Sequence, residues 1–219
     1  MTKLFIARPA PPEVHAALEG YDVTYRTAST PLSVQEMQTA LRDYDGVLPT
    51  LGDQFSADIF SSVDAPRCKI LANFGVGYNH INVDAARQAR VQVSNTPGAV
   101  TDATADIAMT LMLMTARRAG EGERLVRSGN WAGWEPSQLL GLHLTGKTVG
   151  IVGMGRIGQA VARRCHFGFE MDVKYYSRSA KSLAFSAEHI NDLRLLAGSV
   201  DVLVVAVPGG DDTHHLINA

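Results

Sequence analysis

Three glycines that follow a short apolar run carry the clearest chemical signal in the sequence. Gly153, Gly155 and Gly158 form the pattern G-x-G-x-x-G directly after residues 148–152, whose β-branched apolar residues predict a buried strand. Residues 159–165 continue as an amphipathic helix. A strand, a tight glycine turn and a helix in this order can bind a dinucleotide, because the backbone approaches the pyrophosphate closely and the helix N-terminus offers free N–H groups. A purely structural glycine turn is the alternative, and the flanking residues favour the nucleotide site.

The residues after the next apolar run bear on the choice of cofactor. NAD-binding proteins usually place an acidic residue there, about 20 residues beyond the glycines, to bond the ribose 2′-hydroxyl. Here residues 173–176 lead instead into Ser177, Arg178 and Ser179. A guanidinium can hold a 2′-phosphate through paired charge-assisted hydrogen bonds, and nearby hydroxyls add donors. The sequence therefore favours NADP(H) as cofactor, with NAD(H) and a solvated basic turn as the alternatives.

A second candidate site lies in residues 73–79, where Gly75 and Gly77 follow an apolar run and precede a helical pattern. Successive N–H groups of such a turn can converge on a carboxylate. Taken alone, an ordinary strand-to-helix turn explains the pattern equally well. Its position at the carboxyl end of a parallel strand, where ligands of open α/β sheets bind, favours the anion site. Residues 51–53 end another predicted strand and are expected to border the same cleft.

Strands and helices alternate along the chain, which predicts parallel sheets covered by helices. The fold class that follows is α/β with two domains: a flavodoxin-like domain over residues 1–98 and an incomplete Rossmann dinucleotide-binding domain over residues 99–219. Ser33 and Glu36 form a predicted capping box at one helix start. The predicted strands are residues 4–7, 23–25, 46–51, 70–74 and 91–94 in the first domain, and 148–152, 173–176 and 202–207 in the second.

One long helix is expected over residues 101–127, broken at Gly120 or Gly122. Its first half is apolar nearly all round, which is typical of a helix buried between layers. Because a full dinucleotide fold uses six strands and the second domain shows three, we expect this domain to be partial.

The bulk composition excludes several classes of function. A formal net charge of −2 provides no field that would attract nucleic acid or an anionic membrane. The two cysteines, Cys68 and Cys165, are too few for a disulfide framework or a metal site. No apolar run reaches the length of about 18 residues that a membrane span needs, and the N-terminus lacks the pattern of a signal peptide. A cytoplasmic protein is expected.

Several longer motifs together resemble one known family. Residues 74–81, 94–98 and 102–106 look like the D-isomer-specific 2-hydroxyacid dehydrogenases, and residues 127–131 and 150–158 extend the match over essentially the whole chain. Leu51, the Gly-Val-Gly loop and residues 176–179 are most similar to the glyoxylate/hydroxypyruvate reductase branch.

The resemblance implies roles for individual positions. The N–H groups of Val76 and Gly77 would bind the substrate carboxylate, with Leu51 beside them. The helix that begins at Thr101 would link the domains and contribute to a homodimer interface. The positions implied to contact the cofactor are Thr104, Gly153, Gly155, Arg156, Ile157, Gly158, Ser177, Arg178, Ser179 and Pro208.

The family's catalytic arginine, glutamate and histidine have no counterparts in these 219 residues, so no catalytic residue is assigned within the chain. The segment that in the family returns to complete the first domain is absent as well. We therefore expect an N-terminal part of a longer enzyme, inactive by itself. The intact enzyme would use NADPH to reduce a small 2-keto acid, glyoxylate or hydroxypyruvate, to the D-2-hydroxy acid.

Two alternatives remain open from the sequence. One is a non-catalytic NAD(P)H-sensing or dimerisation module of the same fold, although a sensor needs no carboxylate site. The other is a dehydrogenase for a different acid, such as D-lactate or 3-phosphoglycerate, because much of the substrate pocket lies outside these residues.

Overall fold

The computed structural model describes residues 1–218, and these divide into two compact units. The first unit comprises residues 1–99 together with the described residues from Gly209 onward, and the second comprises Val100–Pro208. The sequence places its domain boundary next to this division at Pro97-Gly98, but assigns the last residues to the second domain.

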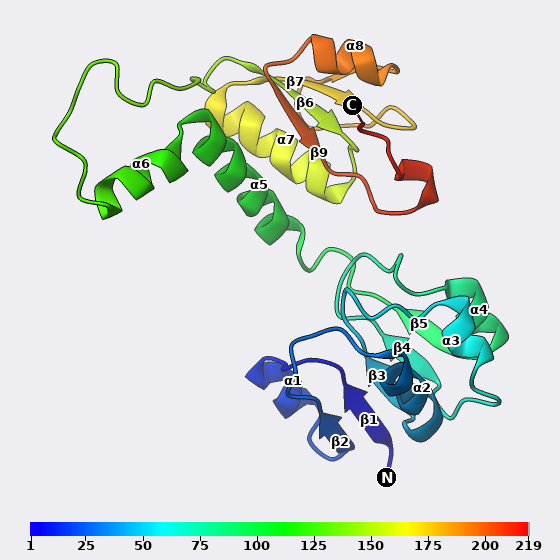
Figure 1. Ribbon diagram of the computed structural model, residues 1–219. Helices are drawn as coiled ribbons and strands as arrows, with labels where there is room; N and C mark the ends of the chain where they lie inside the picture. The colour runs from blue at the N-terminus through cyan, green and yellow to red at the C-terminus, as the bar shows by residue number, and fades with distance from the viewer. Residues whose placement is uncertain (219) are drawn as a thin grey trace. The chain divides into compact units, whose positions relative to one another are not determined.

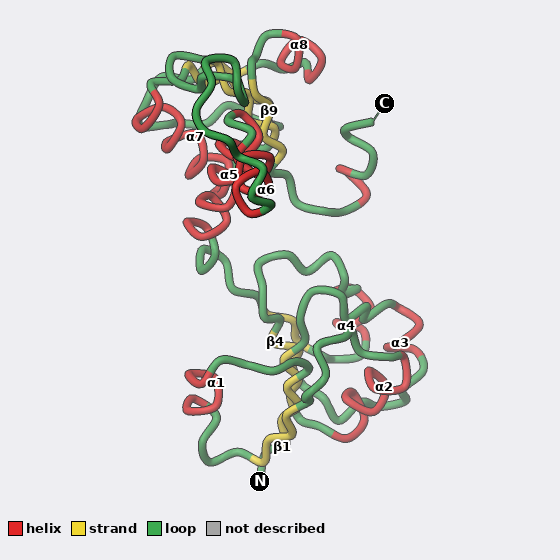
Figure 2. The backbone as a smooth tube through the Cα atoms, turned by 60° about the vertical axis from the view of Figure 1, so that its left-hand side comes forward, coloured by secondary structure: helices red, strands yellow, loops and turns green. Residues whose placement is uncertain are grey.

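The first unit is a parallel sheet with the strand order β2-β1-β3-β4-β5, which is the flavodoxin-like order that the fold class predicts. Its strands are β1 (Lys3–Ile6), β2 (Asp22–Tyr25), β3 (Gly46–Leu48), β4 (Ile70–Ala72) and β5 (Gln92–Ser94). Its helices are α1 (Pro12–Ala17), α2 (Val34–Asp43), α3 (Ala57–Ser61) and α4 (Val83–Gln88). Figures 1 and 2 show α1 on one side of the sheet and α2, α3 and α4 on the other. The capping box at the start of α2 is confirmed, since Ser33 Oγ and the Glu36 carboxylate each accept the other residue's backbone N–H.

The second unit contains a four-stranded parallel sheet of order β8-β7-β6-β9, flanked by helices (Figure 1). Its elements include β6 (Thr148–Val152), α7 (Arg156–Phe169), β7 (Asp172–Tyr176), β8 (Glu188–His189), α8 (Leu193–Gly198) and β9 (Val202–Val205). Numbered along the chain, this is the order 3-2-1-4 of a Rossmann sheet. The predicted count of three strands was wrong, because β8 pairs with β7 through only two residues and has no apolar run.

The long helix is broken earlier than its glycines predict. It forms α5 (Thr101–Ala116) and α6 (Ala119–Arg127), and Arg118 between them adopts a left-handed conformation with φ of 52°. The cause is a competing hydrogen bond: Leu142 N–H donates to the Ala116 carbonyl at 2.8 Å. A helix passing through this point would need that carbonyl for the N–H group four residues on. Gly141 permits the approach, because a Cβ at this position would clash with the same carbonyl oxygen.

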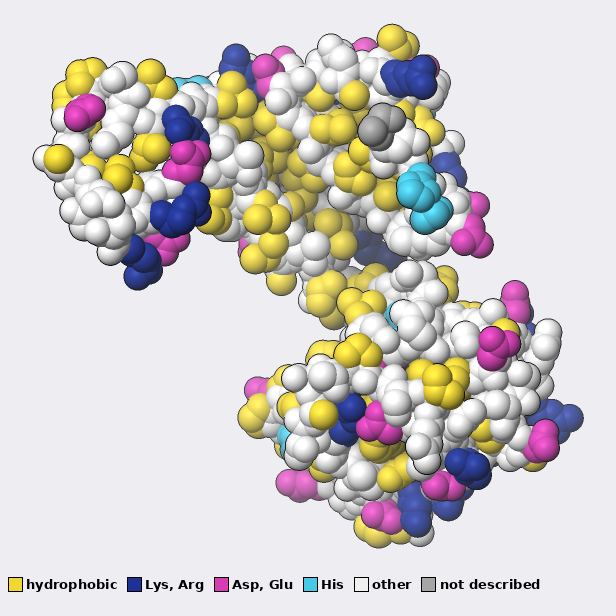
Figure 3. Space-filling model, viewed as in Figure 1, with side chains coloured by type: hydrophobic (Ala, Val, Ile, Leu, Met, Phe, Trp, Pro, Cys, Tyr) yellow, Lys and Arg dark blue, Asp and Glu magenta, His cyan; other side chains and the backbone are white. Residues whose placement is uncertain are grey.

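The face of α5 that does not pack on its own unit remains apolar and exposed. Ala105, Met109 and Met112 are buried, but Ile107, Leu111 and Met114 are 61%, 60% and 41% exposed. The expectation of a helix buried on all sides was therefore wrong for the residues that the structure describes. Figure 3 shows hydrophobic side chains gathered on the surface of the second unit. None of the helices formed by residues 1–218 has the length and apolar character needed to cross a membrane.

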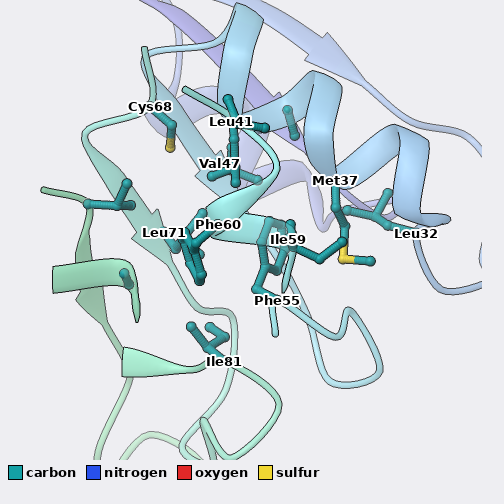
Figure 4. Packing of buried hydrophobic residues seen from close by; sticks show 14 of the residues in the cluster. Leu32, Met37, Leu41, Val47, Phe55, Ile59, Phe60, Cys68, Leu71 and Ile81 are labelled. Carbon is teal, nitrogen blue, oxygen red and sulfur yellow. The ribbon is translucent and has the colours of Figure 1, made fainter. Parts of the chain in front are cut away.

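The core of the first unit lies between the sheet and the helices α2, α3 and α4. Phe55, Leu41 and Leu71 are fully buried at its centre, and Ile59 and Phe60 of α3 pack against them (Figure 4). The helices α2, α3 and α4 contribute three, two and one buried residues to this core.

A buried carboxylate ties the loops of this unit together. The Asp53 side chain is fully buried and accepts Arg8 Nη2 at 2.7 Å and the backbone N–H groups of Leu32 and Thr50, each at 2.9 Å. These donors come from the segments that follow β1, precede α2 and follow β3. One side chain therefore fixes three loops at one edge of the sheet.

Replacing Asp53 by Asn should destabilise the first unit by about 3–5 kcal/mol, because it leaves the Arg8 guanidinium without its anionic partner. Chemical denaturation followed by circular dichroism would measure this loss. Asp84→Asn is the matched control, since the Asp84–Arg87 pair is exposed and its loss should leave the unfolding midpoint unchanged. Equal midpoints for the two variants would show that the Asp53 network contributes little to stability.

Candidate functional site

The fingerprint turn, Gly153–Gly158, is built by backbone contacts that only glycine allows. Gly153 has φ of 96°, and a Cβ at this position would lie 2.6 Å from the Ala206 carbonyl oxygen at the end of β9. A Cβ on Gly158 would clash with the Gly153 carbonyl oxygen. The turn is also fixed to β7 by a 2.9 Å hydrogen bond from Gly153 N–H to the Tyr176 carbonyl. The strand ends of β6, β7 and β9 therefore meet at this turn.

Gly155 differs from the other two glycines because nothing lies within 4 Å of a Cβ built on it. It is the N-cap of α7, so the N–H groups of Arg156 and Ile157 lie in the first helical turn and have no acceptor within the helix. An open glycine in front of such N–H groups fits a pyrophosphate, which needs close backbone approach and donors. The structure thus brings together Gly153, Gly155, Arg156, Ile157 and Gly158.

The basic turn, residues 177–181, follows β7 and adjoins the fingerprint turn through Tyr176. Its backbone is held internally: Ser177 Oγ donates to the Ser179 carbonyl at 2.6 Å, and the His189 ring lies 3.0 Å from the Ser177 carbonyl through Nε2. Lys181 Nζ donates to Ser179 Oγ at 2.9 Å, so a second cation lies in the turn. Arg178 is exposed and forms no ion pair with any residue in the described part of the chain.

Two further predicted cofactor positions lie at the margins of this unit. Pro208 is exposed and follows β9, whose end contacts the fingerprint turn. Thr104 is exposed on the first turn of α5, and no hydrogen bond among the described residues joins it to the fingerprint turn. The flanking Asp102 and Asp106 both pair with Arg164 of α7, at 3.0 and 2.9 Å. Arg164 is half-buried, and its two ion pairs join α5 to α7.

In the first unit, the glycine loop, Gly75–Gly77, turns its carbonyl groups into the protein. The Gly75 carbonyl accepts Thr96 N–H at 3.1 Å, and the Val76 carbonyl accepts Asn95 Nδ2 at 2.8 Å. The N–H groups of Val76 and Gly77 have no acceptor among residues 1–218. Such paired free donors at the carboxyl end of a strand suit a carboxylate.

Leu51 lies beside this loop, as the sequence predicts for a shared cleft. Its side chain is 62% exposed and lies 3.9 and 4.0 Å from Cβ positions built on Gly75 and Gly77. An apolar side chain next to two free donors gives a small site with one polar and one apolar wall. The three predicted substrate positions, Leu51, Val76 and Gly77, therefore lie together.

The polar side chains beneath the glycine loop were not predicted from the sequence. Asn73 and His80 are 1% and 6% exposed, and His80 Nε2 lies 3.0 Å from Asn73 Oδ1. Burial lowers the pKa of His80, and the charge of Asp53 acts against this shift. The only signal in the sequence is a polar residue at the end of an apolar strand, and it does not reveal which residue contacts it.

The first unit is flavodoxin-like and has a loop with free N–H groups, and the second is Rossmann-type and has a glycine turn of the dinucleotide-binding kind. This combination is typical of two-domain dehydrogenases. Residues 109–219 match the family model described as the D-isomer specific 2-hydroxyacid dehydrogenase, NAD binding domain. The chain belongs to the D-isomer specific 2-hydroxyacid dehydrogenase family. The resemblance inferred from the motifs is thereby confirmed, and the match to this domain supports a nicotinamide cofactor.

Individual relatives place the chain within this family. It is 40% identical to a glyoxylate reductase of Thermococcus kodakarensis, with 99% of this chain and 66% of the relative covered. It is 34% identical to a glycerate dehydrogenase of Hyphomicrobium methylovorum, with 99% and 68% covered. The crystal structure of the TT0316 protein from Thermus thermophilus superposes with a TM-score of 0.87 at 34% identity, covering 98% of this chain and 68% of that one. The chain thus spans about two thirds of the length of these relatives.

The glycines of the fingerprint turn should respond differently to substitution. Gly158→Ala should destabilise the second unit by about 1–3 kcal/mol, because the added methyl group meets backbone that cannot move aside. Gly155→Ser should leave its stability unchanged, since the position is open and serine is a favoured N-cap residue. Differential scanning calorimetry of both variants tests this, and a lower Tm for Gly155→Ser than for Gly158→Ala would contradict the geometry.

The stability of the first unit should depend on pH through His80. The unfolded histidine has a pKa of about 6.5, and the folded value is lower, so the unfolded chain takes up the proton first as the pH falls. Stability from this group is therefore complete above about pH 7.5 and is lost progressively below about pH 6.5. Urea denaturation at several pH values should show this loss in the unsubstituted chain. His80→Gln should remove that component, and an unchanged pH profile in this variant would assign the effect to other groups.

Proposed function

We propose that this chain forms the cofactor-binding and carboxylate-binding parts of an NADPH-dependent reductase of glyoxylate or hydroxypyruvate. The observation that carries the proposal is the pair of N–H groups without acceptors at Val76 and Gly77, next to the apolar side chain of Leu51. A site of this size and polarity suits a small 2-keto acid. The similarity to glyoxylate reductases supports the same substrate class.

The residues of the chain have distinct tasks in the proposed reaction. When bound, a nicotinamide cofactor would supply the hydride for the keto carbon, and the keto oxygen would take up a proton. Val76 and Gly77 hold the carboxylate and so fix the position of the adjacent keto carbon. Arg156 and Ile157 bind the pyrophosphate through their N–H groups, where Gly155 leaves room. His80 does not serve as proton donor, because it is buried and its ring bonds Asn73; we expect the proton donor outside these residues.

The basic turn supports a preference for NADP(H) over NAD(H). Arg178 is exposed, so its guanidinium is available to a phosphate, and Ser179 and Lys181 lie in the same turn. No carboxylate occurs in residues 177–181 to bond a ribose 2′-hydroxyl. The 2′-phosphate of NADP(H) would thus meet two cations and the hydroxyl groups of the turn.

Arg178→Gln should weaken NADPH binding about 10- to 100-fold and leave NADH binding unchanged, because charge-assisted bonds to the 2′-phosphate are lost. Fluorescence titration with each cofactor gives the two dissociation constants. Arg163→Gln, at an exposed cation on α7, is the matched control and should change neither. A variant that loses both cofactors equally, or neither, would refute the assigned role of Arg178.

Titration of the chain with NADPH and with glyoxylate separates the proposal from its rival. Glyoxylate should shift the amide resonances of Val76 and Gly77, while NADPH should shift those of the fingerprint turn. Binding of NADPH without any effect of glyoxylate would favour the sensing module instead. NADPH oxidation by the 219-residue chain is expected to be negligible, since the proton donor is expected elsewhere.

We also propose that the chain forms a homodimer through α5. Ile107, Leu111 and Met114 are spaced by four and three residues, so they lie on one face of the helix. Exposed apolar residues grouped in this way are typical of an interaction surface.

Leu111→Glu should weaken dimerisation by about 2 kcal/mol or more, because it places a charge in an apolar contact. Sedimentation velocity over a range of concentrations would measure the change. Leu195→Glu on α8 is the matched control, since Leu195 is equally exposed but lies on another helix. A monomeric unsubstituted chain, or dimers of equal strength in both variants, would exclude this surface.

A further inference from the structure

We infer that Asn73 and His80 form a buried positioning pair that holds the glycine loop in its carboxylate-binding conformation. The inference rests on the proposed function, because it assigns these residues a task in the carboxylate site proposed above. Neither side chain is expected to touch the substrate: both lie beneath the loop and are almost completely buried. They act through the backbone of residues 75–77.

The orientation of the Asn73 amide follows from its partners. Its nitrogen, Nδ2, lies 3.1 Å from the Gly75 carbonyl oxygen and 2.9 Å from the Gly77 carbonyl oxygen. Two carbonyl oxygens can accept but not donate, so the NH2 end of the amide must face them. Both hydrogens of Nδ2 are thereby used, and one side chain joins the two ends of the loop.

The orientation of Asn73 in turn fixes the protonation of His80. Asn73 Oδ1 faces the ring, and an amide oxygen only accepts, so His80 Nε2 must carry the hydrogen of the 3.0 Å bond. The other ring nitrogen, Nδ1, is buried and has no hydrogen-bond partner among the described residues. A hydrogen on Nδ1 would be a buried unpaired donor, which favours the neutral ring. His80 is therefore a neutral Nε2–H donor.

These hydrogen bonds determine the direction in which the peptide groups of the loop point. With the Gly75 and Gly77 carbonyls bound by Asn73, and the Val76 carbonyl bound by Asn95, all three carbonyl oxygens are engaged within the protein. The N–H groups of Val76 and Gly77 are left without acceptors and available to a ligand. A loop with two glycines has many other conformations of similar energy. The pair removes this freedom before a carboxylate arrives, which lowers the entropic cost of binding.

Three variants test the pair without any ligand. His80→Leu removes the donor to Asn73, and Asn73→Asp removes the donors to the two carbonyls while keeping the shape of the side chain. His80→Gln is the conservative variant, because its amide nitrogen can take the place of Nε2. The measurement is amide hydrogen exchange and backbone ¹⁵N relaxation of residues 75–77 in the 219-residue chain.

Loosening of the loop in His80→Leu and Asn73→Asp, with retention of its order in His80→Gln, is the expected result. A loop that is equally ordered in all variants would overturn the inference. Loosening in His80→Gln to the same extent as in His80→Leu would also overturn it, because it would assign the effect to ring packing. Resonances of β4 and α4 report whether each variant keeps its fold.

A second experiment titrates the chain and its variants with oxamate, an unreactive analogue of a small 2-keto acid. Binding is followed through the backbone amide resonances of Val76 and Gly77. His80→Leu should weaken oxamate binding about tenfold, and His80→Gln by less than about threefold, in line with the loss or retention of one buried hydrogen bond. NADPH binding should be the same in all variants, since the fingerprint turn belongs to the other unit. Absence of oxamate binding in the unsubstituted chain would refute the proposed carboxylate site, whereas the ligand-free measurements alone decide the positioning role.

Discussion

Backbone polar groups at the carboxyl ends of parallel strands need partners, and both candidate sites depend on how this requirement is met. In the glycine loop, side chains and a neighbouring strand end bind the carbonyl oxygens, which leaves N–H groups for a ligand. In the fingerprint turn, the start of α7 provides the free N–H groups directly. The two candidate anion sites thus obtain their free N–H groups by different means, one with amide side chains that bind the carbonyls and one with a helix terminus.

The first unit relies on buried polar residues in addition to its hydrophobic core. Asp53 binds three separate loops, and Asn73 binds both ends of the glycine loop. Its helices α1, α3 and α4 are short and bury few side chains, so hydrophobic packing alone leaves the loops weakly constrained. Hydrogen bonds from fully buried groups supply the missing constraint, because breaking one leaves a desolvated partner unpaired.

Local patterns were sufficient to predict most of the elements and the two glycine turns that form the candidate sites. The G-x-G-x-x-G spacing, the β-branched strand before it and the capping box at Ser33 each act within a few residues, so the sequence displays them directly. Contacts between distant residues were not predictable in this way. The bonds of Asp53 to Arg8 and of His80 to Asn73 arise from the packing of separate segments, and the same residue types occur on protein surfaces. The strand β8 escaped detection for a related reason, since two residues gain strand geometry only by pairing with β7.

The break between α5 and α6 has a consequence for how this part of the chain can vary. The bend is set by a hydrogen bond from Leu142, which lies in the connector between α6 and β6 (residues 128–147), and by the absence of a side chain at Gly141. Helix propensity within residues 101–127 therefore does not determine where the bend lies. Related proteins can change the sequence of either helix and keep the same bend, provided that the connector still reaches the Ala116 carbonyl. The segment after α6 thus constrains the bend from a distant point in the sequence, and the direction in which α6 leaves α5 depends on the close approach that Gly141 permits.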